Sequence, residues 1–442
     1  MNAWIIQSLL RLRASYYFIP SLMCFAAIGL GLLTVAIDLN YQPEIREALG
    51  WFYASTVDNA RSILTTVAGS MISVAAVTFS LTMVAVTTAA GQYGPRLIGN
   101  FMRDRSNQVT LGMFLSTFLF CIVVLRSVSD EMGDGAAGLI PSVSVLVALI
   151  LTLISVGVLI YFIHHIPETL NVGTLTSKVA QTLLSQIERG QFPNDNKLET
   201  VDGAELGDPF DPALTQTVRS RASGYVEAIS LKGLLEWTDE QGCRVRLRRV
   251  PGDFVMQGDA LMDIAPDNPA QPLAQDLNEQ IGSDVRGFVA LGRERTVYQN
   301  LLFPADELVE IASRALSPGV NDPFTAINCI HWFGDICLAM INAPKTPDCV
   351  IGADGTPRIW AGSVGFDRLC DTLFGQSRQY ICADENVSRQ TLDVLYHVRD
   401  RADAASAVVL DDQIALLHEA IEQSGLGKAQ KARLRGGPPY KY

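Results

Sequence analysis

Four long stretches without a charged side chain fall within the first 165 residues, and they constrain the fold of this chain more than any other feature. They lie between Arg13 and Asp38, between Arg61 and Arg96, between Arg105 and Arg126, and from Leu139 to Phe162. About 20 apolar residues suffice to cross a bilayer, and at this length only a helix satisfies its own backbone in lipid. The sequence therefore predicts a transmembrane domain over residues 1–165, with helices at about 14–37, 62–91, 108–126 and 139–163.

The charge of the chain is divided unevenly between its two parts. Residues 1–165 hold 8 Lys and Arg against 8 Asp and Glu, whereas residues 166–442 hold 26 against 38, a net charge of −12. Nucleic-acid binding needs clustered basic residues that release counterions, so the acidic second part disfavours a nucleic-acid partner. The expected fold class is an α-helical membrane domain with four transmembrane helices, joined to a cytoplasmic α+β region with a helical C-terminal part.

The short connections between the predicted helices indicate their orientation. Arg11 and Arg13 precede the first helix, and Arg96, Arg103 and Arg105 lie between the second and the third. The connection between the third and fourth helices is acidic and contains no Lys or Arg. Because Lys and Arg are retained on the cytoplasmic side, we expect a multi-pass protein of the inner (plasma) membrane with both termini in the cytoplasm.

The second predicted helix differs from the others in length and in side-chain chemistry. Its uncharged run of 34 residues would extend about 51 Å, well beyond a hydrocarbon core of about 30 Å. Hydroxyl side chains recur on one face of this helix at spacings of three, four and seven residues: Thr66, Ser70, Ser73, Ser80 and Thr87. This face either packs against a neighbouring helix or, in a homo-oligomer, lines an uncharged polar pathway.

The same helix ends in Gly91-Gln92-Tyr93-Gly94-Pro95-Arg96, where Gly and Pro stop a helix. Gln92, Tyr93 and Arg96 are therefore candidates for contact with headgroups, an anion or a second subunit at the membrane surface. A plain structural turn is the alternative. No Asp, Glu, Lys or Arg lies in the middle of any predicted span, which disfavours a proton relay or an active transporter but leaves a passive pore open.

Residues 166–217 are expected to form an amphipathic helix and a polar linker, and residues 218–300 a small β domain. The run from Gly252 to Leu261 has the pattern Gly-Asp-x-Val-x-x-Gly-Asp-x-Leu and resembles the small barrel-sandwich of biotinyl and lipoyl carrier domains. No lysine stands on a hairpin tip, so the resemblance implies the shape without the carrier chemistry. One strand carries arginines that either form a solvated face or bind an anion: Arg244, Arg246, Arg248 and Arg249.

Residues 301–427 show the periodicity of amphipathic helices. The run from Ser317 to Pro323 predicts a turn in which Asn321 or Asp322 caps the next helix and Pro323 takes its first position. Free N–H groups at such a helix start can hold an anion or a carboxylate of another subunit. The candidates for this ligand or subunit contact are Ser317, Asn321, Asp322 and Thr325, with structural capping as the alternative.

Two further segments have recognisable local patterns. Residues 349–362 are predicted to form a hairpin around Asp354-Gly355. Residues 428–442 form a basic tail with five Lys and Arg and no acidic residue. Such a tail either rests on anionic lipid or is disordered.

Two motifs together resemble a known family. The first combines Phe79-Ser80-Leu81-Thr82, Gln92-Tyr93-Gly94-Pro95-Arg96 and Leu111-Gly112, and the second is the run Ala-Leu-Ser-Pro-Gly-Val-Asn-Asp-Pro-Phe-Thr-Ala from Ala315 to Ala326. Both are similar to predicted bacterial membrane proteins grouped as domain of unknown function twenty-two fifty-four. In that family Ser often stands where this chain has Gly94. The resemblance runs over nearly the whole chain and implies four membrane helices, a cytoplasmic domain and no established activity.

The sequence contains no recognisable catalytic motif, and its eight cysteines show no metal-ligand spacing, so we expect neither an enzyme nor a cofactor nor a metal site. The leading hypothesis is a homo-oligomeric inner-membrane channel or permeation pathway lined by the second helix, with the soluble part as a cytoplasmic vestibule or gate. The alternative is a non-conducting scaffold or sensor whose soluble part binds a ligand or a protein. The expected partners are the lipid bilayer and other copies of the chain, and the identity of any ion or small ligand stays open.

Overall fold

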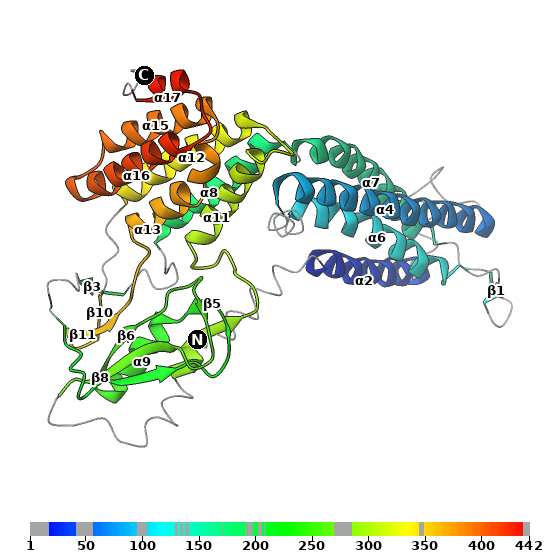
Figure 1. Cartoon of the computed structure of the whole chain (residues 1–442). Coiled ribbons are helices and arrows are strands. Elements are labelled where there is room, and N and C mark those ends of the chain that lie inside the picture. The colour runs from blue at the N-terminus through cyan, green and yellow to red at the C-terminus, as the bar shows by residue number, and fades with distance from the viewer. Residues whose placement is uncertain are drawn as a thin grey trace. The chain divides into compact units, whose positions relative to one another are not determined.

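The structure is a computed structural model in which the chain divides into an N-terminal unit that ends at Asn171 and a C-terminal unit that begins at Val172 (Figure 1). The described residues are 17–40, 56–94, 104–128, 131–132, 136–137, 141–169, 171–190, 192, 198–201, 206, 208–268, 285–343 and 349–435. Residues 14–16 of the first predicted helix and 436–442 of the predicted tail lie outside them.

Among the described residues, four helices and a two-stranded hairpin make up the N-terminal unit. They are α2 (Phe18–Asn40), α4 (Val57–Tyr93), α6 (Arg105–Leu125), β1 (Glu131–Met132), β2 (Ala136–Ala137) and α7 (Ser142–Thr169). Each helix covers most of one charge-free stretch, and its ends differ from the predicted ends by six residues at most. Side-chain caps explain two of these differences. Thr56 accepts a hydrogen bond from the N–H of Asn59 (3.2 Å) and Asp104 from that of Ser106 (2.8 Å), so α4 and α6 begin before their apolar runs do.

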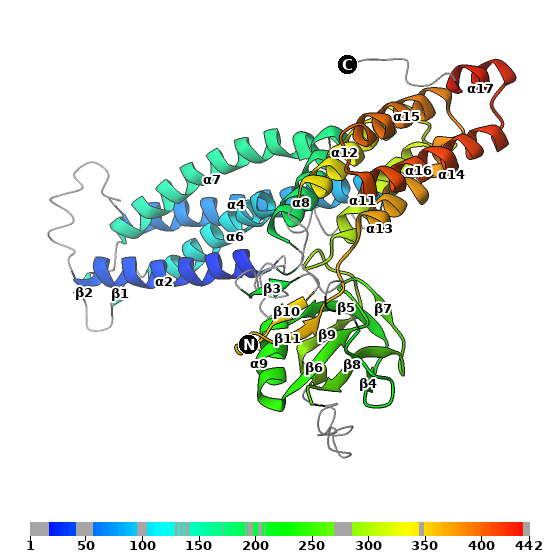
Figure 2. The ribbon, with the colours of Figure 1, turned by 90° about the vertical axis from the view of Figure 1, so that its left-hand side faces the viewer.

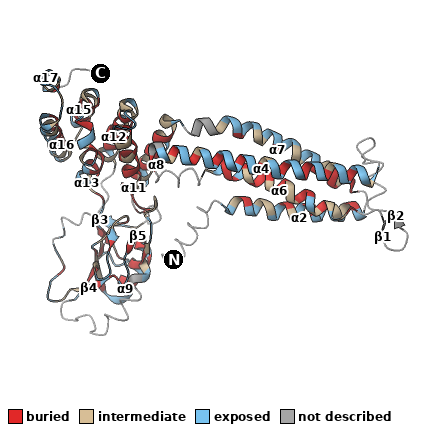
Figure 3. Cartoon of the chain, turned by 45° about the vertical axis from the view of Figure 1, so that its right-hand side comes forward, coloured by how far each residue is buried: buried red, intermediate tan, exposed pale blue. Residues whose placement is uncertain are grey.

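α6 is the central helix of the N-terminal unit, because α2, α4 and α7 all pack on it. Its side chains Phe114 and Phe120 are buried. α2 and α6 approach closely at Gly112, where an added Cβ would lie 2.6 Å from Met23 Sδ and 3.2 Å from Pro20 Cα. Buried residues follow the inward faces of these helices and exposed residues their outer faces (Figure 3). The unit is therefore a helical bundle built around α6.

Among the described residues of the C-terminal unit there are two β-sheets (Figure 2). Buried side chains from both sheets form one hydrophobic core. The larger sheet has the strand order β3 (Thr200–Val201), β10 (Cys349–Ile351), β11 (Pro357–Trp360), β6 (Cys243–Leu247), β8 (Ala260–Pro266) and β4 (Gln216–Arg219). The smaller sheet has the order β7 (Phe254–Val255), β5 (Gly224–Ile229) and β9 (Val289–Gly292). Helix α9 (Leu231–Gln241) and the 3₁₀-helix η5 (Val285–Phe288) complete this part.

The predicted hairpin around Asp354-Gly355 is confirmed as β10 and β11, which pair antiparallel. Its place in the fold differs from the expectation, because β11 pairs in parallel with β6, with Ile359 opposite Val245. A segment expected within the helical region thus completes the sheet of the β region. In the same way β3 lies within the stretch expected to be a linker, and β4 begins at Gln216, just before the predicted end of that linker at residue 217.

The Gly-Asp run forms turns as expected, since Gly252 and Gly258 both adopt positive φ angles, of 99° and 94°. These turns flank β7 and lead into β8. The arrangement of two sheets does not confirm the barrel-sandwich shape that the run suggested.

Helices form the rest of the C-terminal unit. They are α8 (Val172–Arg189), α11 (Leu302–Ala315), α12 (Pro323–Asn342), α13 (Phe366–Cys370), the π-helix η6 (Asp371–Gly375), α14 (Arg378–Ile381), α15 (Glu385–Arg399), α16 (Ala404–Gln423) and α17 (Lys428–Leu434). α12 packs against α8, α11 and α15, and its buried side chains include Ile330 and Phe333.

Part of the predicted tail is helical, which corrects the alternative of a disordered segment for residues 428–435, while contact with anionic lipid stays a prediction. α17 contacts α15, and Arg435 pairs with Glu422 (2.6 Å). Lys431 Nζ donates to two backbone carbonyls, of Glu422 and Ser424, each at 2.7 Å. These basic side chains therefore fix the last helix to the protein.

Five described helices are long and apolar enough to cross a membrane: α2, α4, α6, α7 and α12. The fifth was not singled out from the sequence. It belongs to the C-terminal unit, where one side of it is buried among other helices.

Candidate functional site

The packing face of α4 is a stripe of apolar and small residues. Leu64, Ala68, Met71 and Ala75 are buried, and they recur at spacings of three and four residues. The stripe continues through Thr82 to Ala89 and faces the rest of the bundle, where α4 packs on α6 and α7. This side of α4 is therefore occupied within a single chain.

The hydroxyl residues predicted from the sequence lie on the other side of α4. All five of them are exposed: Thr66, Ser70, Ser73, Ser80 and Thr87. Ser73 is nine residues from both Leu64 and Thr82, which are buried. Nine residues at about 100° per residue correspond to half a turn beyond two complete turns, so Ser73 points directly away from the packing face. Packing of this face against another described helix of the same chain is thus not observed.

Three of these hydroxyl groups bond to the helix that carries them. Ser70 donates to the carbonyl of Thr66 (2.7 Å), Ser73 to that of Gly69 (2.8 Å) and Thr87 to that of Met83 (2.9 Å). A hydroxyl that donates in this way keeps its oxygen lone pairs as acceptors. The face is therefore uncharged, carries outward acceptors, and suits contact with water, a cation or a donor on another helix.

The end of α4 is described only in part. The helix runs to Tyr93, and the N–H of Gly94 donates to the carbonyl of Ala90 (3.2 Å). Gln92 and Tyr93 have helical backbones, but their side chains are not described, and Arg96 lies outside the described residues. Their contact with the membrane surface stays a prediction.

A buried carboxylate that sequence reasoning passed over joins α2 to α7. Asp38 accepts hydrogen bonds from the N–H of Val143 (2.9 Å) and from the N–H and hydroxyl of Ser144 (3.0 and 2.7 Å). An acidic side chain is favourable at a helix N-terminus, where the N–H groups are free. The signal in the sequence is an acidic residue at the very end of a charge-free run.

At the other end of α7, His165 lies 3.4 Å from Asp104, the cap of α6. Tyr161 stacks on His165 at 5.2 Å between ring centroids, and its hydroxyl is 3.1 Å from Ser106 Oγ. Both ends of α7 are thus tied to neighbouring helices by polar groups.

The predicted corner between α11 and α12 is confirmed as a capped turn. Asp322 accepts from the N–H of Thr325 (3.1 Å) and from its hydroxyl (2.6 Å), and Pro323 is the first residue of α12. Ser317 donates to the carbonyl of Arg314 (2.6 Å). Asn321 is exposed and adopts a positive φ of 49°. The four candidate residues are therefore close together, and the side chains of Ser317, Asp322 and Thr325 form hydrogen bonds within the corner.

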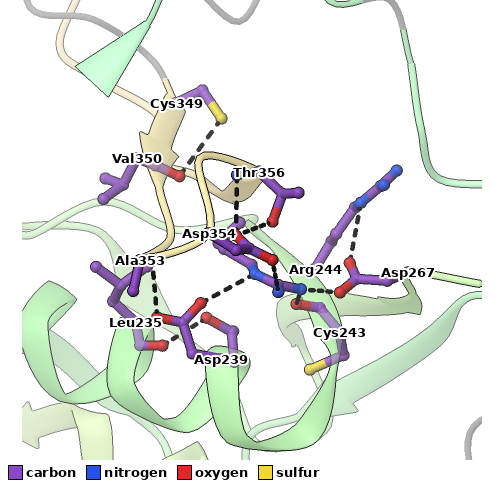
Figure 4. Close-up of polar contacts among 12 residues, drawn as sticks. Leu235, Asp239, Cys243, Arg244, Asp267, Cys349, Val350, Ala353, Asp354 and Thr356 are labelled. Carbon is purple, nitrogen blue, oxygen red and sulfur yellow. Dashed lines mark hydrogen bonds and ion pairs between the residues drawn. The ribbon is translucent and has the colours of Figure 1, made fainter. Parts of the chain in front are cut away.

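The densest described polar cluster lies on the larger sheet and has a structural role (Figure 4). Arg358 of β11, 6% exposed, pairs with Asp239 of α9 (3.0 Å), with Asp354 of the hairpin turn (2.9 Å) and with Asp267 after β8. Asp267 also accepts from Arg244 Nε (3.1 Å). Two guanidinium groups thus bind three carboxylates, which fixes the β10–β11 hairpin to α9 and β8 and leaves this arginine no room for a ligand.

The four arginines considered as an anion site all have acidic partners. The pairs are Arg244–Asp267, Arg246–Asp208, Arg248–Asp263 and Arg249–Asp259. Arg246 also lies 4.1 Å from the ring centroid of Phe210. The N–H of Phe210, and then Arg246, lower the pKa of Asp208 by hydrogen bonding to its carboxylate. Charge pairing rather than anion binding accounts for these residues. Among the described His, Cys, Asp and Glu residues, no group of three or more is placed to hold a metal ion.

Comparison with known proteins gives a family but no activity. The family model described as "Predicted membrane protein (DUF2254)" matches residues 13–397. The uncharacterized protein MT1328 of Mycobacterium tuberculosis is 26% identical over 431 residues, which cover 96% of this chain and 80% of that protein. The uncharacterized protein Mb1321c of Mycobacterium bovis has the same identity and coverage. No solved structure matches the chain.

Proposed function

The chain belongs to the DUF2254 family of predicted membrane proteins, and from this premise we propose that it forms a homo-oligomeric permeation pathway in the inner membrane, lined by α4. In this proposal α2, α4, α6 and α7 cross the bilayer. α12, although apolar enough to cross, is assigned to the cytoplasmic body because α8, α11 and α15 bury one side of it. In this proposal both termini lie in the cytoplasm, which the positions of the arginines support.

The observation that carries the proposal is the position of the hydroxyl residues directly opposite the packing face of α4. Lipid-facing surfaces of the neighbouring helices are aliphatic, as Leu153 and Ile160 of α7 and Leu32 of α2 show by their high exposure. Along the centre of the outer face of α4, hydroxyl residues such as Ser73 and Ser80 share the surface with the smaller aliphatic residues Val77 and Val84, which are also exposed. Polar groups on a membrane helix turn toward protein or water rather than acyl chains. Copies of the chain arranged with these faces inward would enclose an uncharged polar path.

Large apolar residues on the flanks of the same face fit contacts between copies. Ile72, Phe79 and Leu81 are exposed in the single chain. In an oligomer they would pack between neighbouring α4 helices while the hydroxyl residues face the axis. In the alternative, a non-conducting scaffold, the same hydroxyl face serves only for helix packing. The following experiments distinguish this scaffold from a permeation pathway.

The test is ion flux through the full-length protein in liposomes. Efflux of K⁺ and Cl⁻ is measured for the parent and for Ser73→Leu and Ser80→Leu, which place aliphatic groups on the face. A hydrophobic constriction closes a polar path by dewetting, so we expect flux to fall by about tenfold or more. Thr65→Leu is the matched control, since Thr65 is also exposed on α4 but lies about 80° around the helix from Ser73; its flux should equal that of the parent.

Cross-linking of the same variants separates assembly from conduction. A pathway requires that Ser73→Leu and Ser80→Leu keep the oligomeric state of the parent while flux falls. If the parent conducts no faster than empty liposomes and the variants lose only their self-association, the face is a packing surface and the pathway is refuted.

A further inference from the structure

The corner between α11 and α12 exposes apolar side chains at the surface of the C-terminal unit. Phe324 is 75% exposed, more than any other large hydrophobic residue described in this unit, and Val320 is 47% exposed. Pro318 and Gly319, which precede them, are exposed as well. We call the segment Pro318–Phe324 the apolar corner. Large exposed apolar residues in a rigid turn indicate a surface that a membrane or another molecule covers.

Hydrogen bonds hold the apolar corner in one conformation. The N–H groups of Val320 and Asn321 donate to the carbonyl of Ser317 (3.0 and 2.9 Å), and that of Asp322 donates to the carbonyl of Ala315 (2.7 Å). Both oxygens of Asp322 are bound at the start of α12 by Thr325. The carboxylate is therefore turned toward the helix, and the apolar side chains form the exposed part of the corner.

The apolar corner lies at the same end of the helical layer as the start of α8. Near that start, Thr176 Oγ1 donates to Asn328 Oδ1 in the second turn of α12 (3.1 Å). Near the other end of α8, Gln186 donates to the carbonyl of Val297, ahead of α11. α11 therefore runs antiparallel to α8, and its last turn brings the chain back toward the first turn of α8. Figure 1 shows α8, α11 and α12 side by side.

The start of α8 is held close to the end of a membrane helix by the chain itself. α7 ends at Thr169 and α8 begins at Val172, so their Cα atoms are at most about 11 Å apart. The apolar span of α7 reaches His165, one helical turn earlier. If α7 crosses the bilayer, this short connection keeps the first turn of α8 near the membrane surface at which α7 ends, in any orientation of the C-terminal unit.

We propose that the apolar corner is a membrane-surface contact, with Phe324 and Val320 inserted at the boundary between headgroups and acyl chains. The occupant is a lipid surface, because the chain path holds this end of the unit near the bilayer. The inference requires α7 to cross the membrane, as in the proposed function, but it does not require conduction, so the two fail separately. The contact would fix the height of the cytoplasmic body over the bilayer.

The test places a fluorescent probe at the corner of the full-length protein in liposomes. Phe324→Cys is labelled with an NBD maleimide and quenched either by nitroxide-labelled lipid or by aqueous iodide. Phe254→Cys is the matched control, since Phe254 is also an exposed aromatic residue, 48% exposed. Phe254 lies two residues after Gly252, where an added Cβ would be 2.5 Å from Asn300 Nδ2. Asn300 precedes the first residue of α11, so Phe254 lies near the opposite end of that helix from the apolar corner. Labelling of the parent chain gives the background from native cysteines, most of which are buried.

We expect lipid nitroxide to quench the probe at position 324 at least twofold more than the probe at position 254, and iodide to show the reverse order. Equal quenching of both positions by iodide, with no effect of lipid nitroxide, would show a corner in water and would overturn the proposal. Protection of position 324 from both quenchers would show that protein covers the corner, and this also overturns it. Val320→Cys repeats the measurement at the second exposed residue of the corner, so the result does not depend on one variant.

Discussion

Asp38 binds Ser144 twice, through the N–H at 3.0 Å and through the hydroxyl at 2.7 Å, although the two residues are separated by 105 others in the chain. The carboxylate is buried at the end of α2 and caps the start of α7. The first and last described helices of the bundle are thereby joined at one end through one buried carboxyl group.

Replacement of Asp38 by Ala should therefore destabilise the bundle. It leaves the N–H groups of Val143 and Ser144 buried without this acceptor, which costs about 2 kcal/mol in the free energy of unfolding. Thermal unfolding of the purified protein in detergent measures the loss. Asp58→Ala, at an exposed position of α4, is the control and should change little; equal effects of the two variants would contradict the capping role.

Gly112 should tolerate no side chain. A Cβ atom at this position would meet Met23 Sδ at 2.6 Å and the backbone of Pro20 at 3.2 Å, so Gly112→Ala must push α2 away from α6 and lower stability by about 1–3 kcal/mol. At Gly157 of α7 the same addition meets nothing within 4 Å. Gly157→Ala should thus leave the melting temperature unchanged or raise it slightly, and a similar loss in both variants would argue against close α2–α6 packing.

Arg358 should be required for the β10–β11 hairpin. Arg358→Met removes the cation from three carboxylates, and breaking a nearly buried pair in this way costs about 3–5 kcal/mol. The expected readout is faster proteolysis of residues 349–360 together with a lower melting temperature. Arg399→Met, which breaks the exposed pair with Asp411, serves as the comparison and should have little effect.

Asp393 of α15 should make stability depend on pH. Both of its oxygens are buried without a hydrogen-bond partner among the described residues, and burial raises its pKa above the ordinary value. The ionised form is thus disfavoured in the folded protein, so the contribution of Asp393 to stability is most favourable below the unfolded pKa and is lost as the pH rises through the folded pKa.

Asp393→Asn should therefore raise the free energy of unfolding near neutral pH by about 1 kcal/mol, and the gain should vanish as the pH falls toward 4. Denaturant titrations at both pH values measure the difference between variant and parent. Asp400→Asn, at an exposed site, should show no such trend. A gain that grows toward low pH would reverse the expected sign and refute the burial of an ionised carboxylate.

Local signals predicted much of this fold. The charge-free runs gave the four bundle helices, because hydropathy over 20 residues depends on neighbouring positions alone. The cap at Asp322, the first-position Pro323 and the hairpin at Asp354 were predicted for the same reason. In these cases the residue that determines the local structure lies within a few positions of the backbone groups that it affects.

Features that depend on distant partners were not predictable from the pattern. Nothing local in β6 indicates that its neighbour is β11, more than 100 residues further on, or that its arginines meet aspartates from other segments. The basic residues at 428–435 suggested lipid because their acidic partners lie on other helices, as Glu422, the partner of Arg435, does. For the α4 face, the sequence identified the hydroxyl residues, and their exposure became visible only once the opposite face was known to be buried.

The order of strands in the larger sheet has a consequence for how the protein is made. β6 lies between β8 and β11, and β11 ends at Trp360. During synthesis β6 emerges from the ribosome more than 100 residues before its second neighbour, and until then it is an open edge able to pair with a foreign strand. Charged side chains discourage such pairing, and Arg244 and Arg246 alternate along this strand. The arginines that bind aspartates in the folded protein would thus protect the nascent chain from aggregation until β11 has been synthesised and can pair with β6.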